Sequence, residues 1–374
     1  MIYRELGTTG LKVSQLGFGA MRLPMVSEEK GAPVDDELAI PMIHRAFEAG
    51  VNYIDTAVGY CNRDSQRAVG AALKGWRDKI VVSTKNHYYD EDESEWWKNL
   101  EDSLRLLDVE TIDIYNHHGI RWKTWQEKVE PRVSKWMVKA REQGLIRHIC
   151  VSFHDDNDAL RNIVDTGYAS SITLQYNLLD RQLADGIAYA KQKGIGVVVM
   201  GPVGGGRLGG ASEVLGGALP NVGRVPELAL RFVLANPDVS VALSGMSTMR
   251  QVEENLATAS DPAVLSADDL AVIDELLERL KKMAELYCTG CKYCMPCPEE
   301  VAIPKIFERY NRGRVYGLWE SARAEYARLG KGWDKGAKAD ACVECGECEE
   351  KCPQNIPIRK QLKEAHEALT DTDQ

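Results

Sequence analysis

Four ionisable side chains have the types and the order of a proton-transfer site. Asp55 and Tyr60 belong to the stretch NYIDTAVGY, Lys85 ends the run KIVVSTK, and His118 ends IDIYNHH. A free phenol has a pKa near ~10 and is a poor proton donor at neutral pH. A nearby ammonium would lower that pKa, and a carboxylate would hold the ammonium charged and in place. Tyr60 could then protonate a carbonyl oxygen as hydride reaches its carbon, while His118 orients that oxygen.

Three successive strand-like segments position these groups. The apolar stretch of Lys79–Lys85 is typical of a parallel strand that is buried on both faces. In a parallel barrel the carboxyl ends of the strands meet on one face, where catalytic residues lie. Neighbouring strand residues point to opposite faces, so only one of His117 and His118 can join this site.

These residues resemble the aldo-keto reductase family, whose catalytic tetrad is Asp, Tyr, Lys and His in this order. The resemblance is carried by IDTAVGY, STK and DIYNHH, supported by TLQYNLLDR and GMSTMRQVEENL, and it covers residues 1–260. It implies a TIM barrel that interconverts a carbonyl and an alcohol with a nicotinamide cofactor. It also implies that the catalytic residues are Asp55, Tyr60, Lys85 and His118. The family's spacing from Asp113 selects His118, and we expect His117 to be packed or hydrogen-bonded elsewhere.

The pattern along the chain predicts an α/β fold in which eight strands alternate with helices. A hairpin is expected over 1–13, and in the family such a hairpin closes the bottom of the barrel. Pro41 lies in a predicted helix over 37–49, where it is tolerable only in the first turn. Strands are expected at 15–21, 51–55, 79–85, 112–118, 148–153, 171–177, 196–202 and 240–245. The other predicted helices are 95–107, 125–143, 182–193 and 226–235.

The resemblance carries over the nicotinamide site only in part. Gln175 matches the glutamine that the family places on the carboxamide. Ser152 matches a family serine, although Phe153 stands where asparagine is usual and Met200 where many members stack a tyrosine. The glycine run with Arg207 resembles the loop over the pyrophosphate, since bare glycines let backbone amides approach phosphates; a merely flexible loop is the alternative. The remaining expected cofactor contacts are Gly204, Gly205, Gly245, Ser247, Thr248, Arg250, Glu254 and Asn255.

The residues that usually bind an adenosine 2′-phosphate are replaced by Gly245 and Gln251. Arg250 is adjacent, and its planar guanidinium suits a phosphate. The sequence therefore favours NADP(H) over NAD(H) while leaving both open, together with a barrel that binds its nicotinamide weakly.

Eight of the ten cysteines lie in two blocks of similar spacing. Disulfides are unexpected in a cytoplasmic chain, and two zinc sites are an alternative. Cysteines at this spacing closed by Cys-Pro are typical of bacterial proteins with two [4Fe–4S] clusters, in which the last cysteine of each block binds the other block's cluster. One cluster would take Cys288, Cys291, Cys294 and Cys352, and the other Cys342, Cys345, Cys348 and Cys297.

The 374 residues suit a barrel of about 250 residues followed by a smaller module. We predict a barrel over 1–262, a bridging helix over 263–286 and a small, mainly α-helical ferredoxin-like domain over 287–374, with helices at 305–311 and 319–329. The net charge of −10 argues against a nucleic-acid or membrane partner, and no signal peptide is evident, so a soluble, cytoplasmic chain is expected.

The expected partners are a small carbonyl or alcohol substrate and a ferredoxin-type electron donor or acceptor. Two alternatives stay open. The protein could be an electron-transfer or redox scaffold whose barrel has lost or changed its chemistry, or the clusters could be purely structural.

Overall fold

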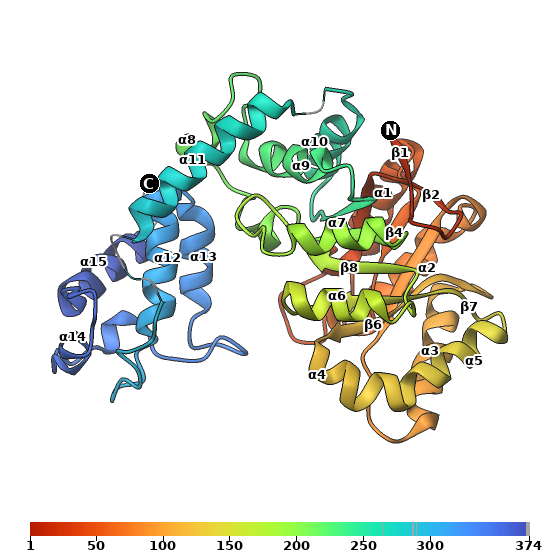
Figure 1. Cartoon of the computed structure of the whole chain (residues 1–374), viewed down its shortest axis with the longest axis horizontal. Coiled ribbons are helices and arrows are strands. Elements are labelled where there is room, and N and C mark those ends of the chain that lie inside the picture. The colour runs from red at the N-terminus through yellow and green to blue at the C-terminus, as the bar shows by residue number, and fades with distance from the viewer. Residues whose placement is uncertain (264, 286–287, 289, 372–374) are drawn as a thin grey trace. The chain divides into compact units, whose positions relative to one another are not determined.

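A computed structural model describes residues 1–263, 265–285, 288 and 290–371, and the chain forms two compact units (Figure 1). The first unit comprises Met1–Gly205 and Ala229–Val264, and the second comprises Gly206–Leu228 and Leu265–Gln374. The segment Gly206–Leu228, which the sequence placed in the barrel domain, thus belongs to the second unit. The predicted limits at 286, 287 and 374 lie outside the described residues.

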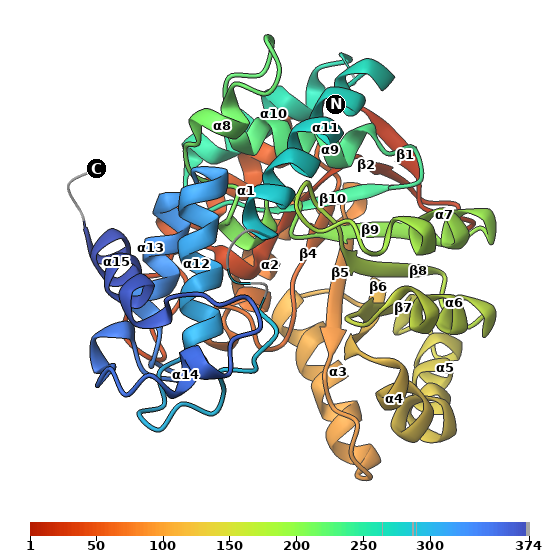
Figure 2. The same ribbon diagram turned by 60° about the vertical axis from the view of Figure 1, so that its left-hand side comes forward.

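The first unit contains a closed barrel of eight parallel strands in the order β10-β3-β4-β5-β6-β7-β8-β9. This confirms the predicted TIM barrel, and the labelled strands can be followed in Figure 2. The strands are β3 (Leu16–Gly19), β4 (Tyr53–Asp55), β5 (Val81–Asn86), β6 (Ile112–Ile120), β7 (Ile146–Phe153), β8 (Ser171–Gln175), β9 (Gly196–Met200) and β10 (Val241–Gly245).

Helices follow the strands, as a parallel barrel requires. They are α1 (Asp36–Glu48), α2 (Ser65–Leu73), α3 (Glu93–Leu107), α4 (Trp122–Thr124), α5 (Ser134–Glu142), α6 (Asn157–Asp165), α7 (Ala184–Gln192), α9 (Val225–Ala235) and α10 (Met249–Ser260). The predicted helix 125–143 is instead divided into a π-helical segment, Trp125–Val133, and α5. Helices α2, α6 and α10 were not predicted.

The position of Pro41 differs from expectation. The cap of α1 is Asp35, whose carboxylate accepts from the backbone N–H of Leu38, so Pro41 lies beyond the first turn. A proline there removes one helical hydrogen bond. The helix continues because its apolar face is buried on both sides of the proline, with Ala39 before it and Met42 after it.

The N-terminal hairpin closes one end of the barrel, as expected. Strands β1 (Tyr3–Glu5) and β2 (Lys12–Ser14) pair antiparallel, and Leu6 and Val13 belong to the buried cluster that fills the barrel interior. Gly7 has a φ of +54°, and a Cβ there would lie 2.3 Å from the backbone nitrogen of Gly196. Only glycine lets the hairpin approach β9 so closely.

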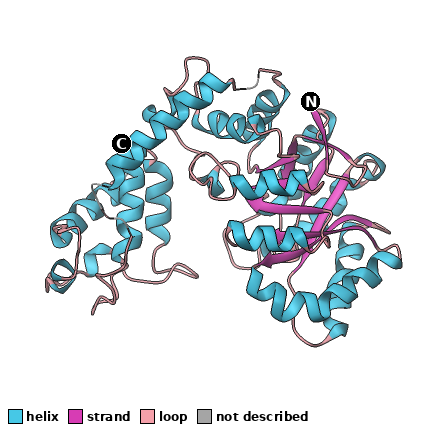
Figure 3. Ribbon diagram, viewed as in Figure 1, coloured by secondary structure: helices cyan, strands magenta, loops and turns pink. Residues whose placement is uncertain are grey.

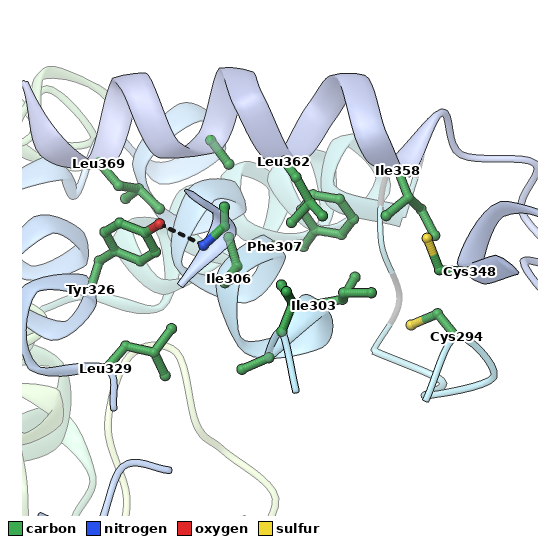
Figure 4. Close-up of a cluster of buried hydrophobic side chains, with 14 of the residues drawn as sticks. Cys294, Ile303, Ile306, Phe307, Tyr326, Leu329, Cys348, Ile358, Leu362 and Leu369 are labelled. Atoms are coloured by element: carbon green, nitrogen blue, oxygen red, sulfur yellow. Dashed lines mark hydrogen bonds between the residues drawn. The ribbon is translucent and has the colours of Figure 1, made fainter. Parts of the chain in front are cut away.

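The second unit consists of helices and loops, whereas the strands of Figure 3 lie in the first. Its helices are α8 (Glu213–Gly216), α11 (Ala267–Glu285), α12 (Ile303–Tyr316), α13 (Trp319–Arg328), α14 (Glu347–Glu350) and α15 (Ile358–Thr370). Its core packs α12, α13 and α15 together, and Figure 4 shows Cys294 and Cys348 at one end of this core. None of the helices in the described part of the chain combines the length and apolarity needed to cross a bilayer.

Candidate active site and cluster-binding cavities

Strand alternation carries the predicted catalytic residues to the inside of the barrel. Tyr53 and Ile114 belong to the interior cluster. Residues two or four places further along the same strands face the same side, so Asp55 and His118 also point inward. Because the strands are parallel, these residues lie towards the carboxyl ends, the face on which TIM barrels carry their active sites.

Asp55 and Lys85 form a buried ion pair beneath this face. Their side chains are only 5% and 2% exposed, and the Lys85 ammonium donates hydrogen bonds to the Asp55 carboxylate and, over 2.8 Å, to the carbonyl oxygen of Thr56. The other carboxylate oxygen of Asp55 accepts from Ser83 over 2.7 Å, and Ser83 in turn accepts from Asn116 over 3.1 Å. Both charges of the pair thus have further hydrogen-bond partners, which a buried charge requires.

Tyr60 and His118 lie next to this pair. The ammonium of Lys85 is 4.8 Å from the centroid of the Tyr60 ring, and the Tyr60 and His118 rings meet edge to face with centroids 5.9 Å apart. The backbone of His118 is held by the hydroxyl of Tyr89, which donates to its carbonyl oxygen over 2.8 Å. The structure therefore brings the four predicted residues together in one cluster.

The protonation states differ in part from the sequence expectation. Burial raises the pKa of Tyr60, although the Lys85 ammonium opposes this shift. Lys85 does act to lower the pKa of Tyr60, as expected, but the pKa is raised overall. Desolvation of the phenolate outweighs the attraction of the ammonium. Burial alone would lower the pKa of Lys85, but Asp55 and Tyr60 outweigh it and the pKa is raised. Burial, reinforced by Lys85, lowers the pKa of His118 to about 3. At neutral pH, Tyr60 is therefore a protonated phenol and His118 a neutral imidazole.

His117 occupies the opposite face of β6, as alternation predicted. Its side chain is fully buried, and its Nε2 atom lies 3.0 Å from the hydroxyl of Tyr168, with which it forms a hydrogen bond. Its ring also stacks on that of Tyr168. His117 is thus a packed, hydrogen-bonded histidine.

The three residues after Tyr60 adopt a left-handed backbone conformation that was not predicted from the sequence. Cys61, Asn62 and Arg63 have φ angles of +49°, +54° and +71°. Left-handed backbone at non-glycine residues costs on the order of 1–3 kcal/mol each and collects at functional sites. Asn62 anchors the segment by donating to the carbonyl oxygen of Ala32 over 2.9 Å.

A buried hydroxyl with open hydrogen-bonding capacity fits a nicotinamide at this end of the barrel. Ser152 is 1% exposed, and its hydroxyl has no hydrogen-bond partner among the described residues. A buried hydroxyl is normally paired, so a ligand amide would complete it. Gln175 lies at the end of β8, where its amide nitrogen donates to Asp180 over 2.8 Å. Gly204 and Gly205 form a tight turn after β9 with φ angles of +61° and +67°.

The predicted adenosine-side residues lie around the start of α10. Gly245 ends β10, and Thr248 caps the helix by accepting from the backbone N–H of Gln251. Arg250 and Glu254 lie in its first two turns, and Asn255 donates to Ser244 over 3.0 Å.

Arg22 also lies in this region, although the sequence analysis did not predict it as a cofactor contact. Arg22 follows β3; its guanidinium donates to the carbonyl oxygen of Gly205 over 3.0 Å, and its backbone carbonyl accepts from Ser247 over 2.7 Å. It thereby joins the glycine turn to the start of α10 and brings a positive charge to both. Its place just after a barrel strand was the available signal.

Arg207 lies in the second unit. Its guanidinium forms an ion pair with Glu325 of α13, with Nε and Oε1 3.4 Å apart. Glu325 also pairs with Arg309 and Arg312 of α12. Ser212, in the same segment as Arg207, donates to the carbonyl oxygen of Tyr316 over 2.6 Å. Two contacts thus fasten the segment 206–228 to the helices α12 and α13.

The cysteines of the second unit line two cavities that correspond to the predicted crossed ligand sets. Besides apolar side chains and a few charged ones, the first contains Cys297 with Cys342, Cys345 and Cys348, and the second contains Cys288, Cys291 and Cys294 with Cys352. Cys294 also borders the first cavity. In each cavity the last cysteine of one block joins three from the other. Four thiols in a largely apolar enclosure are the donor set of a [4Fe–4S] cluster.

Within the described residues, no three or more His, Cys, Asp or Glu side chains converge on the position of a single metal ion. A [4Fe–4S] cluster binds one thiolate at each iron, so its four ligands need not converge on one point.

Comparison with known proteins agrees with both halves of this description. Residues 15–216 match the Aldo/keto reductase family, and residues 287–356 match a 4Fe-4S dicluster domain. The chain is 29% identical to the L-galactose dehydrogenase of Arabidopsis thaliana over 310 residues, covering 75% of this chain and 95% of that protein. It is 28% identical over 328 residues to the NADH-specific methylglyoxal reductase of Escherichia coli, covering 74% of this chain and 98% of that protein.

Among solved structures, the holo form of an aldo-keto reductase from Bacillus halodurans matches with a TM-score of 0.64 and 29% identity, covering 74% of this chain and 96% of that one. The family match, the closed barrel and the cysteine-rich unit agree. The chain belongs to the aldo/keto reductase family of oxidoreductases, and a 4Fe-4S dicluster domain follows its barrel.

Proposed function

We propose that this protein interconverts a small carbonyl compound and its alcohol with a nicotinamide cofactor, using Tyr60 as the general acid and base. The observation that carries the proposal is the buried Asp55–Lys85 ion pair, with its ammonium 4.8 Å from the centroid of the Tyr60 ring. A buried ion pair costs desolvation free energy and is weak evidence for stability alone, so its position beside a phenol favours a role in proton transfer.

The four residues divide the work of carbonyl reduction. The neutral imidazole of His118 donates a hydrogen bond to the carbonyl oxygen and orients it. Tyr60, protonated at neutral pH, transfers its proton to that oxygen as negative charge develops. Lys85 stabilises the phenolate that remains, and Asp55 holds Lys85 charged and oriented. In alcohol oxidation the proton moves back to Tyr60.

NADP(H) or NAD(H), when bound, supplies or accepts the hydride. Ser152 and Gln175 would hold the carboxamide, and the turn at Gly204 and Gly205 with Arg22 would face the pyrophosphate. The residues for the adenosine end are Gly245, Ser247, Thr248, Arg250, Glu254 and Asn255. The buried Ser152 hydroxyl, which lacks a hydrogen-bond partner among the described residues, supports this assignment.

We further infer that the second unit holds two [4Fe–4S] clusters with crossed ligation. The two cysteine-lined cavities support this number, and the clusters would exchange electrons with a ferredoxin-type partner.

Tyr60→Phe tests the catalytic assignment. Reduction of aldehydes by NADPH or NADH should fall by ~10²–10⁴-fold, because general acid catalysis contributes that much. Binding of the nicotinamide, followed by its fluorescence, should be nearly unchanged since the ring remains. Tyr189→Phe is the matched control, because the Tyr189 hydroxyl bonds Asp165 on an exposed helix face.

Full activity in Tyr60→Phe would end the role of Tyr60. A wild-type protein that binds neither nicotinamide would instead favour a redox scaffold.

A further inference from the structure

Basic groups surround the end of the barrel where Tyr60 and His118 lie. Asn86 of β5 pairs in register with His117 of β6, so His87 comes beside His118. On the other side, the backbone N–H of His154 donates to the carbonyl oxygen of Ile120 over 2.9 Å, which places it next to the end of β6. Three neighbouring strands therefore present a histidine each at their carboxyl ends.

Two arginines accompany these histidines. Arg63 is three residues beyond Tyr60, in the left-handed segment, and Arg121 directly follows β6. Both arginines lie in loops that follow barrel strands, at the end of the barrel that carries Tyr60 and His118, and both side chains are exposed.

Neither arginine forms an ion pair in the part of the chain that the structure describes. Throughout the described residues, no carboxylate lies within 4.0 Å of the guanidinium of Arg63 or Arg121, although the chain carries a net charge of −10. Two neighbouring carboxylates have other partners. Asp64 pairs with Arg67 and accepts from the backbone of Val34, while Asp155 accepts from the backbone N–H of Trp122.

The cofactor does not account for this charge. The proposed nicotinamide contacts follow β3, β7, β8, β9 and β10, whereas Arg63 and Arg121 follow β4 and β6. A positive region next to a proton donor attracts anions and raises their local concentration.

Building on the proposed function, we infer that the substrate carries an anionic group, a carboxylate or a phosphate, besides its carbonyl, and that Arg63 and Arg121 bind this group. The planar guanidinium is suited to both anions, since its N–H groups match two oxygens at once. Neutral His87 and His154 can each donate one further hydrogen bond.

Matched substrates test this inference on the full-length protein with clusters and nicotinamide present. One pair is 4-carboxybenzaldehyde and its methyl ester, and a second is glyceraldehyde 3-phosphate and glyceraldehyde. We expect KM to be roughly tenfold or more lower for the charged member of at least one pair, and which pair responds distinguishes carboxylate from phosphate. The preference should shrink as salt rises.

The variants Arg63→Gln, Arg121→Gln and the double variant should remove that preference while leaving turnover of the neutral members unchanged. Arg105→Gln removes the same charge from an exposed pair with Asp102 on α3 and should change nothing. Equal KM values within both pairs, unaltered in the variants, would overturn the inference and leave the proposed function intact.

If no aldehyde is turned over, the proposed function has failed. The inference of an anion-binding site is then tested by measuring the binding of anions and of their neutral analogues. Calorimetry would compare benzoate with benzamide and inorganic phosphate with neutral glycerol. Tighter binding of an anion that is lost in the double variant supports the inference, and equal binding refutes it.

Discussion

The phenol of Tyr60 experiences influences that shift its pKa in opposite directions. Desolvation raises the pKa, and the ammonium of Lys85 lowers it, with desolvation the larger effect. For carbonyl reduction this balance is useful, because the acid form is fully populated at rest. In the proposed mechanism, Lys85 stabilises the phenolate after the proton has left, which is a property of the transition state and not of the resting enzyme.

The pH dependence follows from these directions. A raised Tyr60 pKa keeps the proton donor intact beyond its ordinary value near ~10, and a His118 pKa of about 3 keeps that imidazole neutral above roughly pH 4. We expect kcat/KM for reduction of a neutral aldehyde to be flat from about pH 5 to pH 9. Alcohol oxidation, which needs deprotonated Tyr60, should rise with pH over the same range.

Steady-state rates at constant ionic strength, with circular dichroism as the check on folding, measure both profiles. A basic limb near pH 7–8 in reduction would show that Lys85 dominates after all, and an acid limb near ~6.5 would show that His118 titrates at its ordinary value.

At the scale of elements, the strands were more predictable than the helices. Short apolar runs that end in Asp55, Lys85 and His118 predicted buried parallel strands, and the structure confirms these strands. Helix α6 could also have been predicted, because Ala159, Leu160, Ile163 and Val164 have helical spacing; all four are buried in the structure.

Other features depend on contacts that are distant in sequence. A Cβ on Gly70 of α2 would lie 2.3 Å from the carbonyl oxygen of Leu106, so this small-residue helix is specified by its close approach to α3. The ion pair of Arg207 with Glu325 was not predicted, because the two residues lie 118 positions apart in the chain. The net pKa of Tyr60 likewise depends on burial, which a motif does not report. Spacing predicted four residues that the structure brings together, whereas their solvation and the long-range ion pairs required the fold.

The cysteine-lined cavities allow a test of crossed ligation, in which the last cysteine of each block binds the other block's cluster. Cys297 borders the cavity of Cys342, Cys345 and Cys348, so Cys297→Ala should damage the cluster of the second block more than that of its own block. Iron and sulfide quantitation, with electron paramagnetic resonance resolving the two clusters, measures this. Cys61→Ala, which removes a barrel thiol, should leave both clusters intact. Loss of the first block's cluster instead would mean that each block binds its own.

At the scale of the whole molecule, the two proposed cofactors would transfer electrons in different numbers. Hydride transfer moves two electrons at once, whereas a [4Fe–4S] cluster normally accepts one. Conversion between the two usually needs a carrier that is stable in the one-electron state, commonly a flavin. The sequence shows no recognisable flavin-binding fingerprint, although a barrel can bind flavin without one.

NADPH or NADH alone should therefore reduce the clusters much more slowly than it reduces an aldehyde, while a reduced ferredoxin should reduce them directly. Anaerobic rapid mixing, followed through the broad visible absorption of the clusters, compares the two donors on the same preparation. The Cys297→Ala protein serves as the control, since it should lose the part of the signal that belongs to one cluster. Bleaching by NADPH or NADH at the rate of aldehyde turnover, without added flavin, would contradict this separation. It would then require a bound one-electron carrier, or a substrate radical that passes the two electrons on separately.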